Sequence, residues 1–153
     1  QQSTGNRGEV AKGGDAHRRQ AEAHADEDAL ARDGKRAAAG VHGILLCHAR
    51  SPEGVRVFVE SCRFPFAKIG VAPGKLGEGT RGSGSEAYAS GIWGLEREDY
   101  LNRADVWPLN PKGEIVLGLK IEDRHAVKNA YGVAAVPGLS FAEWGGGDLS
   151  FSF

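Results

Sequence analysis

The chain has 153 residues, a formal net charge of −1 and 25% charged residues. This length fits one ordinary domain, and the near-neutral charge gives no general electrostatic attraction to nucleic acid or to a membrane surface. No apolar run approaches the ~20 residues that a membrane helix needs, and residues 1–39 contain no apolar signal segment. With two cysteines in the whole chain, we expect no disulfide scaffold and a cytoplasmic setting.

Residues 1–39 differ from the rest of the chain. They are rich in Gly, Ala, Arg, Asp and His and almost lack large apolar side chains. Low hydrophobicity with dense charge is typical of a solvated segment. We therefore treat them as a polar, poorly defined N-terminal segment, in which residues 26–39 are compatible with a surface helix. Residues 40–153 are expected to form the folded unit.

The first clear structural pattern begins after Gly40. Residues 41–47 read VHGILLC, a short apolar run that predicts a buried strand. Ser51 followed by Pro52 is typical of a helix start. Apolar residues then recur at helical spacing on one face, namely Val55, Phe58, Val59 and Cys62. The pattern predicts a strand that leads into an amphipathic helix, with Cys47 and Cys62 both serving as buried apolar filler.

The middle of the chain continues this alternation. Residues 66–72 are expected to form another strand, and the Gly- and Ser-rich residues 74–91 a long loop. Residues 95–104 predict a helix, and the sequence WPLNP at residues 107–111 predicts a turn-rich connector. Alternating strands and helices indicate an α/β fold with a parallel sheet.

Two acidic residues stand at the ends of the last two apolar runs. EIVLGLKIED leads to Glu122 and LSFAEWGGGD ends at Asp148, with helix-like sequence over residues 124–136 between them. A strand–helix–strand crossover brings both strand exits to the same edge of a parallel sheet. Mg²⁺ and Mn²⁺ favour oxygen ligands, and Mg²⁺ usually takes only one or two carboxylates. The pattern predicts a divalent-metal site; the alternative is two ordinary carboxylates that cap a helix or pair with Arg124.

Several segments in consistent order resemble the HpcH/HpaI aldolase/citrate lyase family, the metal-dependent aldolases of 2-oxo acids. They are GVHGILLCHARSPEGVRVFVESCRFPF, TRGSGSEAYASGIWGL, YLNRADVWPLNPKGEIVLGLKIED and VPGLSFAEWGGGDLS, which together cover most of residues 40–150. The resemblance implies a TIM-type (β/α)₈ barrel of the pyruvate-kinase-like type. A full barrel typically needs ~250 residues, so we expect this chain to be a fragment of one. Gln1 as first residue and the lack of methionine agree with that expectation.

The resemblance also implies a reaction and a metal. The family cleaves or forms a carbon–carbon bond next to the enolate of pyruvate or a similar 2-oxo acid, with an aldehyde as the other partner. Its metal-binding Glu and Asp fall on Glu122 and Asp148, with Mg²⁺ or Mn²⁺ as the cofactor. Backbone N–H groups of the turn at Gly145, Gly146 and Gly147 are expected to hold the substrate carboxylate.

Two more residues are candidates for substrate binding, and no catalytic residue is assigned. Arg81 matches the family's Arg-Gly in the long loop, and His48 ends a strand on the expected face. The family's catalytic His and enolate-stabilising Arg belong to earlier strands, and residues 1–39 show no apolar strand that could carry either. A full-length protein of this type is expected to form homo-oligomers.

Three other interpretations stay open. The first is an acyl-CoA lyase of the citryl- or malyl-CoA type, although nothing in the sequence marks a CoA site. The second is a fragment that binds metal or carboxylate without catalysis. The third is an incomplete product whose exposed strand edges and apolar surface lead to aggregation. The basic residues form no stripe with aromatic residues, so no nucleic-acid partner is expected.

Overall fold

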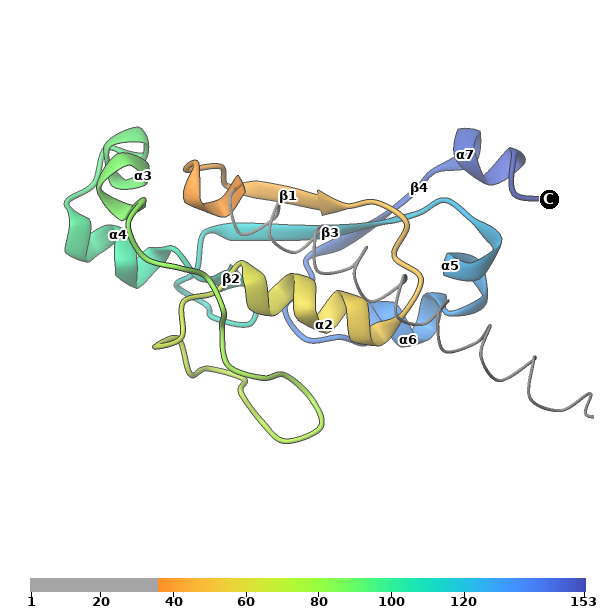
Figure 1. Ribbon diagram of the computed structural model, residues 1–153, viewed down its shortest axis with the longest axis horizontal. Helices are drawn as coiled ribbons and strands as arrows, with labels where there is room; N and C mark the ends of the chain where they lie inside the picture. The colour runs from red at the N-terminus through yellow and green to blue at the C-terminus, as the bar shows by residue number, and fades with distance from the viewer. Residues whose placement is uncertain (1–35) are drawn as a thin grey trace, which may run out of the picture.

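The computed structural model describes residues 36–153 (Figure 1). Of the surface helix expected over residues 26–39, residues 36–38 are helical, and the part before residue 36 lies outside the described residues. The elements follow in the order β1 (Gly43–Leu46), α2 (Pro52–Ser61), α3 (Glu86–Trp93), α4 (Arg97–Arg103), β2 (Val106–Trp107), β3 (Ile115–Ile121), α5 (Arg124–Lys128), α6 (Ala130–Ala134), β4 (Phe141–Trp144) and α7 (Gly146–Ser150).

The strands form one parallel sheet with β3 at its centre. β1 pairs with one side of β3, where Leu45 lies opposite Gly118. On the other side, β2 pairs with the start of β3 and β4 with its end, where Lys120 lies opposite Glu143. Parallel strands that alternate with helices confirm the predicted α/β class. The described residues form an open four-stranded sheet, as expected for part of a (β/α)₈ barrel.

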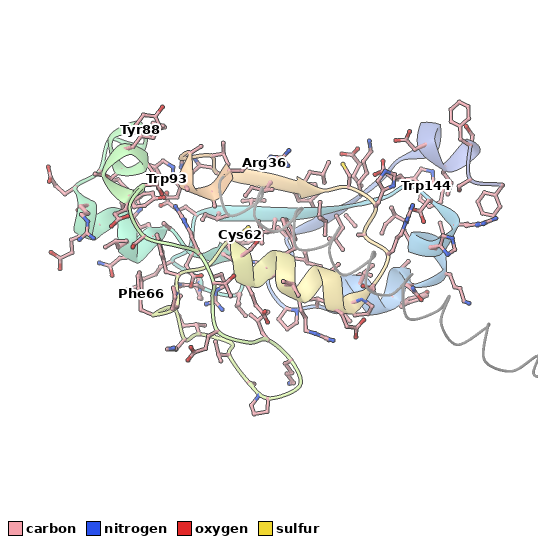
Figure 2. The ribbon with its side chains drawn as sticks, viewed as in Figure 1. Arg36, Cys62, Phe66, Tyr88, Trp93 and Trp144 are labelled. Carbon is pink, nitrogen blue, oxygen red and sulfur yellow. The ribbon has the colours of Figure 1, made fainter. Side chains whose placement is uncertain are left out.

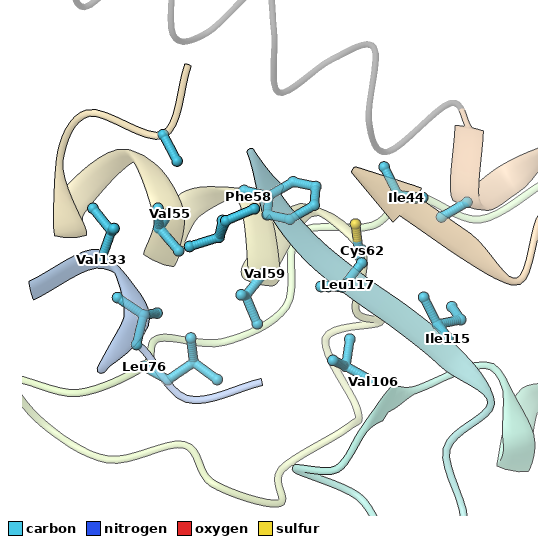
Figure 3. Close-up of a cluster of buried hydrophobic side chains, with 14 of the residues drawn as sticks. Ile44, Val55, Phe58, Val59, Cys62, Leu76, Val106, Ile115, Leu117 and Val133 are labelled. Atoms are coloured by element: carbon cyan, nitrogen blue, oxygen red, sulfur yellow. The ribbon is translucent and has the colours of Figure 1, made fainter. Parts of the chain in front are cut away.

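The main hydrophobic core lies between one face of the sheet and helices α2 and α6 (Figure 3). Leu117 and Leu119 point to this face because side chains alternate along a strand, and both are fully buried. α2 begins as predicted, since the Gly54 N–H donates to the Ser51 side chain over 3.1 Å. The apolar face of α2 is buried as expected, through Val55, Phe58, Val59 and Cys62.

The opposite face of the sheet is more polar. In β3 it carries Gly118 and Lys120, followed by Glu122 just after the strand, because these residues alternate with the core-facing ones. The half-exposed ring of Phe141 from β4 lies directly over Gly118. The carboxyl ends of β1, β3 and β4 lead to the side of the molecule that holds α5 and α7, whereas α3 and α4 lie at the other side (Figure 1).

The predicted strand over residues 66–72 is wrong. This segment forms turns, in which the Ala67 N–H donates to the Phe64 carbonyl and the Val71 N–H to the Lys68 carbonyl. Within the described part of the chain, its pairing is limited to an isolated bridge between Ala72 and Leu76. The apolar residues that suggested a strand lie in a largely exposed loop instead.

Two other boundaries differ from the prediction. The loop expected over residues 74–91 gives way to α3 at Glu86, whose carboxylate accepts the Gly84 N–H over 2.6 Å. The single helix expected over residues 124–136 is divided into α5 and α6 at Asn129. The Asn129 side chain donates to the Arg50 carbonyl over 2.7 Å, which ties this break to the segment after β1.

A buried ion pair joins the end of α2 to the start of β2. Arg63 Nε donates to Asp105 Oδ1 over 2.6 Å and its Nη2 to Oδ2 over 3.0 Å. Burial opposes the charge on Asp105, but the Arg63 guanidinium and the Asn110 amide outweigh it and lower the pKa of Asp105. Arg63 therefore fixes the bend after the helix through its ion pair with Asp105.

No helix among residues 36–153 is long and apolar enough to cross a membrane.

Candidate metal and substrate site

Glu122 lies directly after β3 and its side chain is almost fully buried. The His48 backbone N–H donates to Glu122 Oε1 over 2.9 Å, and His48 Nδ1 lies 3.5 Å from the same oxygen. His48 has a φ of +53°, in the left-handed region that residues other than glycine seldom adopt. The exits of β1 and β3 thus meet at Glu122, and the structure brings two of the predicted site residues together.

Asp148 approaches Glu122 from the next strand exit. It lies in the first turn of α7, right after β4, and its carboxyl is near enough to that of Glu122 to affect the Glu122 pKa. Between β4 and α7 the chain passes so near Glu122 that Gly145 has no room for a Cβ. The Gly145 N–H donates to the Ile121 carbonyl over 2.9 Å, which holds this turn against the end of β3.

The other two glycines of the turn open α7. Gly146 and Gly147 are the first residues of this helix. The first N–H groups of a helix have no acceptor within the helix itself. No heavy atom lies within 4 Å of where a Gly147 Cβ would stand, so the space beside this residue is open.

Asp123 positions the segment after Glu122. Its Oδ1 accepts the N–H groups of His125 and Ala126 over 2.8 and 2.9 Å, so it is the N-cap of α5. Its Oδ2 accepts Arg50 Nε over 2.7 Å and lies 3.3 Å from His48 Nδ1. Burial acts against its charge, yet these backbone donors and Arg50 lower the pKa of Asp123 to about 2.

Glu122 is also held in its charged form. Burial opposes ionisation, but the His48 N–H and the Lys120 ammonium outweigh it and keep the pKa of Glu122 below its ordinary value. The Glu122 side chain is therefore a buried anion that lies at the carboxyl end of β3 and is held by hydrogen-bond donors. Such an arrangement is typical of a ligand-binding carboxylate.

Sequence reasoning missed two neighbours of Glu122. Lys120 Nζ lies 3.3 Å from Glu122 Oε2, and period-two alternation along β3 could have identified it, since both residues share one face. Cys47 also lies beside Glu122 and is exposed, so its assignment as buried filler is wrong. The residue falls on the opposite sheet face from the core. Partial burial, with the Glu122 charge, raises the pKa of its thiol.

The structure does not bring Arg81 to this group. Arg81 is buried; it donates to the Ala37 carbonyl and the Tyr100 hydroxyl, and its guanidinium stacks on Phe64. The Tyr100 ring contacts Trp93, which lies in α3 at the opposite end of the molecule from Trp144 (Figure 2). Arg81 thus orders packing at the α3–α4 end, while a substrate role for it stays a prediction.

The residues at the strand exits fit a hard divalent cation. Neighbouring carboxylates repel each other when both are ionised, and a cation between Glu122 and Asp148 would relieve that repulsion. Within residues 36–153, no three His, Cys, Asp or Glu side chains group as a ready metal cage. A two-carboxylate site that leaves positions for water or substrate oxygens suits Mg²⁺ or Mn²⁺.

The fold of this chain matches that of known structures. No family model matches the chain, and no curated protein matches it. Nine chains of solved structures do. One is an HpcH/HpaI aldolase/citrate lyase family protein from Burkholderia cenocepacia J2315, with a TM-score of 0.61 and 23% sequence identity. The match covers 78% of this chain and 40% of that protein. Over that part, the chain has the fold of an HpcH/HpaI aldolase/citrate lyase family protein, in agreement with the resemblance of its sequence segments.

Proposed function

We propose that this chain carries the metal-binding part of a lyase that cleaves or forms a carbon–carbon bond next to a pyruvate-type enolate. The observation that carries the proposal is the pair of Glu122 and Asp148, which meet at neighbouring strand exits on a fold shared with an HpcH/HpaI aldolase/citrate lyase family protein. In barrels of this kind the active site is at the carboxyl ends of the strands. A cytoplasmic setting belongs to the same proposal.

Each part of the site has a task in this chemistry. A bound Mg²⁺ or Mn²⁺ would supply Lewis acidity for the negative charge that develops on a 2-oxo acid when the carbon–carbon bond breaks. Glu122 and Asp148 would hold that ion. The N–H groups of Gly146 and Gly147 would face the substrate carboxylate, because a glycine turn allows an anion to approach the backbone closely. His48 fixes Glu122 through its backbone N–H and lies at the edge of the site.

A Mn²⁺ titration of the chain, with and without pyruvate, tests the proposal. We expect Mn²⁺ to bind and pyruvate to strengthen binding, since substrate oxygens fill positions that the protein leaves open. Glu122→Gln and Asp148→Asn should each weaken Mn²⁺ binding by at least about tenfold. Glu78→Gln is the matched control, because Glu78 is an exposed carboxylate that pairs with Lys68.

The outcomes separate this function from its rivals. Unchanged Mn²⁺ affinity in both site variants would rule out the proposed metal site. Mn²⁺ and pyruvate binding without turnover of pyruvate–aldehyde aldols would favour a binding fragment without catalysis. Turnover that depends on a CoA thioester would point to the acyl-CoA lyase alternative.

A further inference from the structure

Lys120 lies between two carboxylates on the polar face of the sheet. Its Nζ is 3.3 Å from Glu122 Oε2 and 3.9 Å from Glu143 Oε1. The two partners differ in environment, since the Glu122 side chain is 2% exposed and that of Glu143 is 49% exposed. One ammonium group is thus shared by a buried carboxylate and one at the surface.

The backbone fixes this arrangement. Lys120 and Glu143 are register partners in β3 and β4, and cross-strand partners in a sheet lie close enough for their side chains to interact. Glu122 follows two residues later on the same face. The Lys120 Cε would be 3.0 Å from a Cβ at Gly145, so the stem of the lysine is packed against the turn that leads to Asp148.

A cation bound by Glu122 would meet the Lys120 ammonium. The ammonium already occupies one side of the Glu122 carboxylate, and like charges repel over such short distances. Glu143 offers a second carboxylate on the same face, toward which Lys120 can turn without losing an ionic partner. The geometry therefore gives the Lys120 ammonium a second partner, Glu143, when another cation binds to Glu122.

We propose that Lys120 is a positioning residue that lowers the affinity of the Glu122–Asp148 pair for divalent cations, with Glu143 as its alternative partner. The inference rests on the proposed function. In the absence of a divalent cation, Lys120 pairs with Glu122 and neutralises it. When the cation binds, Lys120 moves to Glu143 and leaves the buried carboxylate free to act as a ligand.

Mn²⁺ titrations of the full chain, followed by the electron paramagnetic resonance signal of free Mn²⁺, test this inference. Lys120→Gln should bind Mn²⁺ about tenfold more tightly than the wild type, because a competing charge is gone. Lys120→Arg should stay near the wild type, because it keeps the charge. Glu143→Gln should bind a few-fold more weakly, about the effect of one exposed ionic partner.

The double variant separates a direct effect of Glu143 from one that acts through Lys120. If Glu143 acts by attracting the ammonium, Glu143→Gln will have no effect in the Lys120→Gln background. A weakening that persists there would mean that Glu143 acts on the metal by itself and would overturn its assigned role. Circular dichroism and thermal unfolding of each variant show that it is folded, and Lys120→Met serves as a second neutral variant.

The result also distinguishes this inference from the proposed function. Mn²⁺ binding by the wild type with equal affinity in Lys120→Gln and Lys120→Met would overturn the role of Lys120 and leave the metal site in place. Absence of Mn²⁺ binding in the wild type and in both neutral variants would overturn both proposals. Binding by the neutral variants that is tighter than in the wild type would support the inference.

Discussion

A Cβ built on Gly145 would stand 2.4 Å from the Cβ of Glu122 and 3.1 Å from its Oε2. Real Cβ atoms essentially never show a contact as short as the first, and the second is tighter than most real contacts. The φ of Gly145 is −93°, so the requirement for glycine comes from this close approach and not from its backbone conformation. The turn after β4 must therefore have glycine at this position to bring Asp148 to the exit of β3.

Gly145→Ala is expected to destabilise the fold by about 1–3 kcal/mol, the usual cost of overpacking, and to weaken Mn²⁺ binding as well. Urea unfolding measures the first effect and the Mn²⁺ titration the second. Gly147→Ala is the matched control, since open space surrounds the added methyl group there. Equal behaviour of the two variants would show that the turn has room to relax.

The buried Arg63–Asp105 pair should contribute far more to stability than the exposed pairs. Asp105→Asn removes the charge that compensates a fully buried guanidinium, and we expect a loss of about 3–5 kcal/mol in the free energy of unfolding. Glu53→Gln is the control, because Glu53 pairs with Arg56 at the surface of α2 and such pairs contribute about 1 kcal/mol or less. Denaturant unfolding of both variants provides the comparison, and losses of similar size would contradict the prediction.

Asp123 should make the fold sensitive to acid over a defined range. Its pKa lies at about 2 in the folded chain, below the ordinary 3.8, so its charge stabilises the fold above pH 3.8 and that stabilisation is lost as the pH falls toward 2. Asp123→Asn keeps an N-cap but has no charge to lose. Between pH 4 and pH 2 the wild type should lose about 1–2 kcal/mol more than this variant, after allowance for solvent around Arg50.

Urea unfolding of the wild type and Asp123→Asn at several pH values checks the acid prediction. Asp123→Ala should cost about 1 kcal/mol more than Asp123→Asn at every pH, because alanine cannot cap α5. Parallel pH profiles for the wild type and Asp123→Asn would show that the Asp123 charge contributes nothing to folding.

The position of the Phe141 ring should depend on the absence of a side chain at Gly118. A Cβ at Gly118 would come within 2.2 Å of the ring, so Gly118→Ala should displace it and cost about 1–3 kcal/mol. In a Phe141→Ala background the same substitution should be close to neutral. This double-mutant cycle, measured by thermal unfolding, would contradict the prediction if the two effects simply added.

The sequence predicted most of the elements that hold the site. β1, the start of α2 at Pro52, β3 and β4 follow from local apolar patterns and a capping residue, and their exits bring Glu122 and Asp148 together. The metal and the substrate remain predictions. The alternation of side chains along β3 could also have placed Lys120 on the same face as Glu122. Its proposed role depends on Glu143 in β4, however, and no pattern within β3 reveals that neighbour.

Three of the errors have a common physical origin, since each depends on which distant parts of the chain come together. Residues 66–72 have an apolar composition, but residues 36–153 provide no neighbouring strand along which they could pair. The helix after Asp123 ends early at Asn129, whose side chain bonds to the backbone of Arg50. Cys47 lies on the polar face of the sheet because of the register between β1 and β3. That register could not be predicted from the sequence of either strand.

The hydrogen bond from the His48 N–H to Glu122 joins residues that are 74 positions apart in the chain. A contact of such long range forms only after a large loop has closed, and folding that depends on such contacts is slow. The carboxylate pair therefore has its donors only in the native state. A cation that binds there would be tied to folding by mass action, raising the stability of the native chain over every partly folded form in which β1 and β3 are separated.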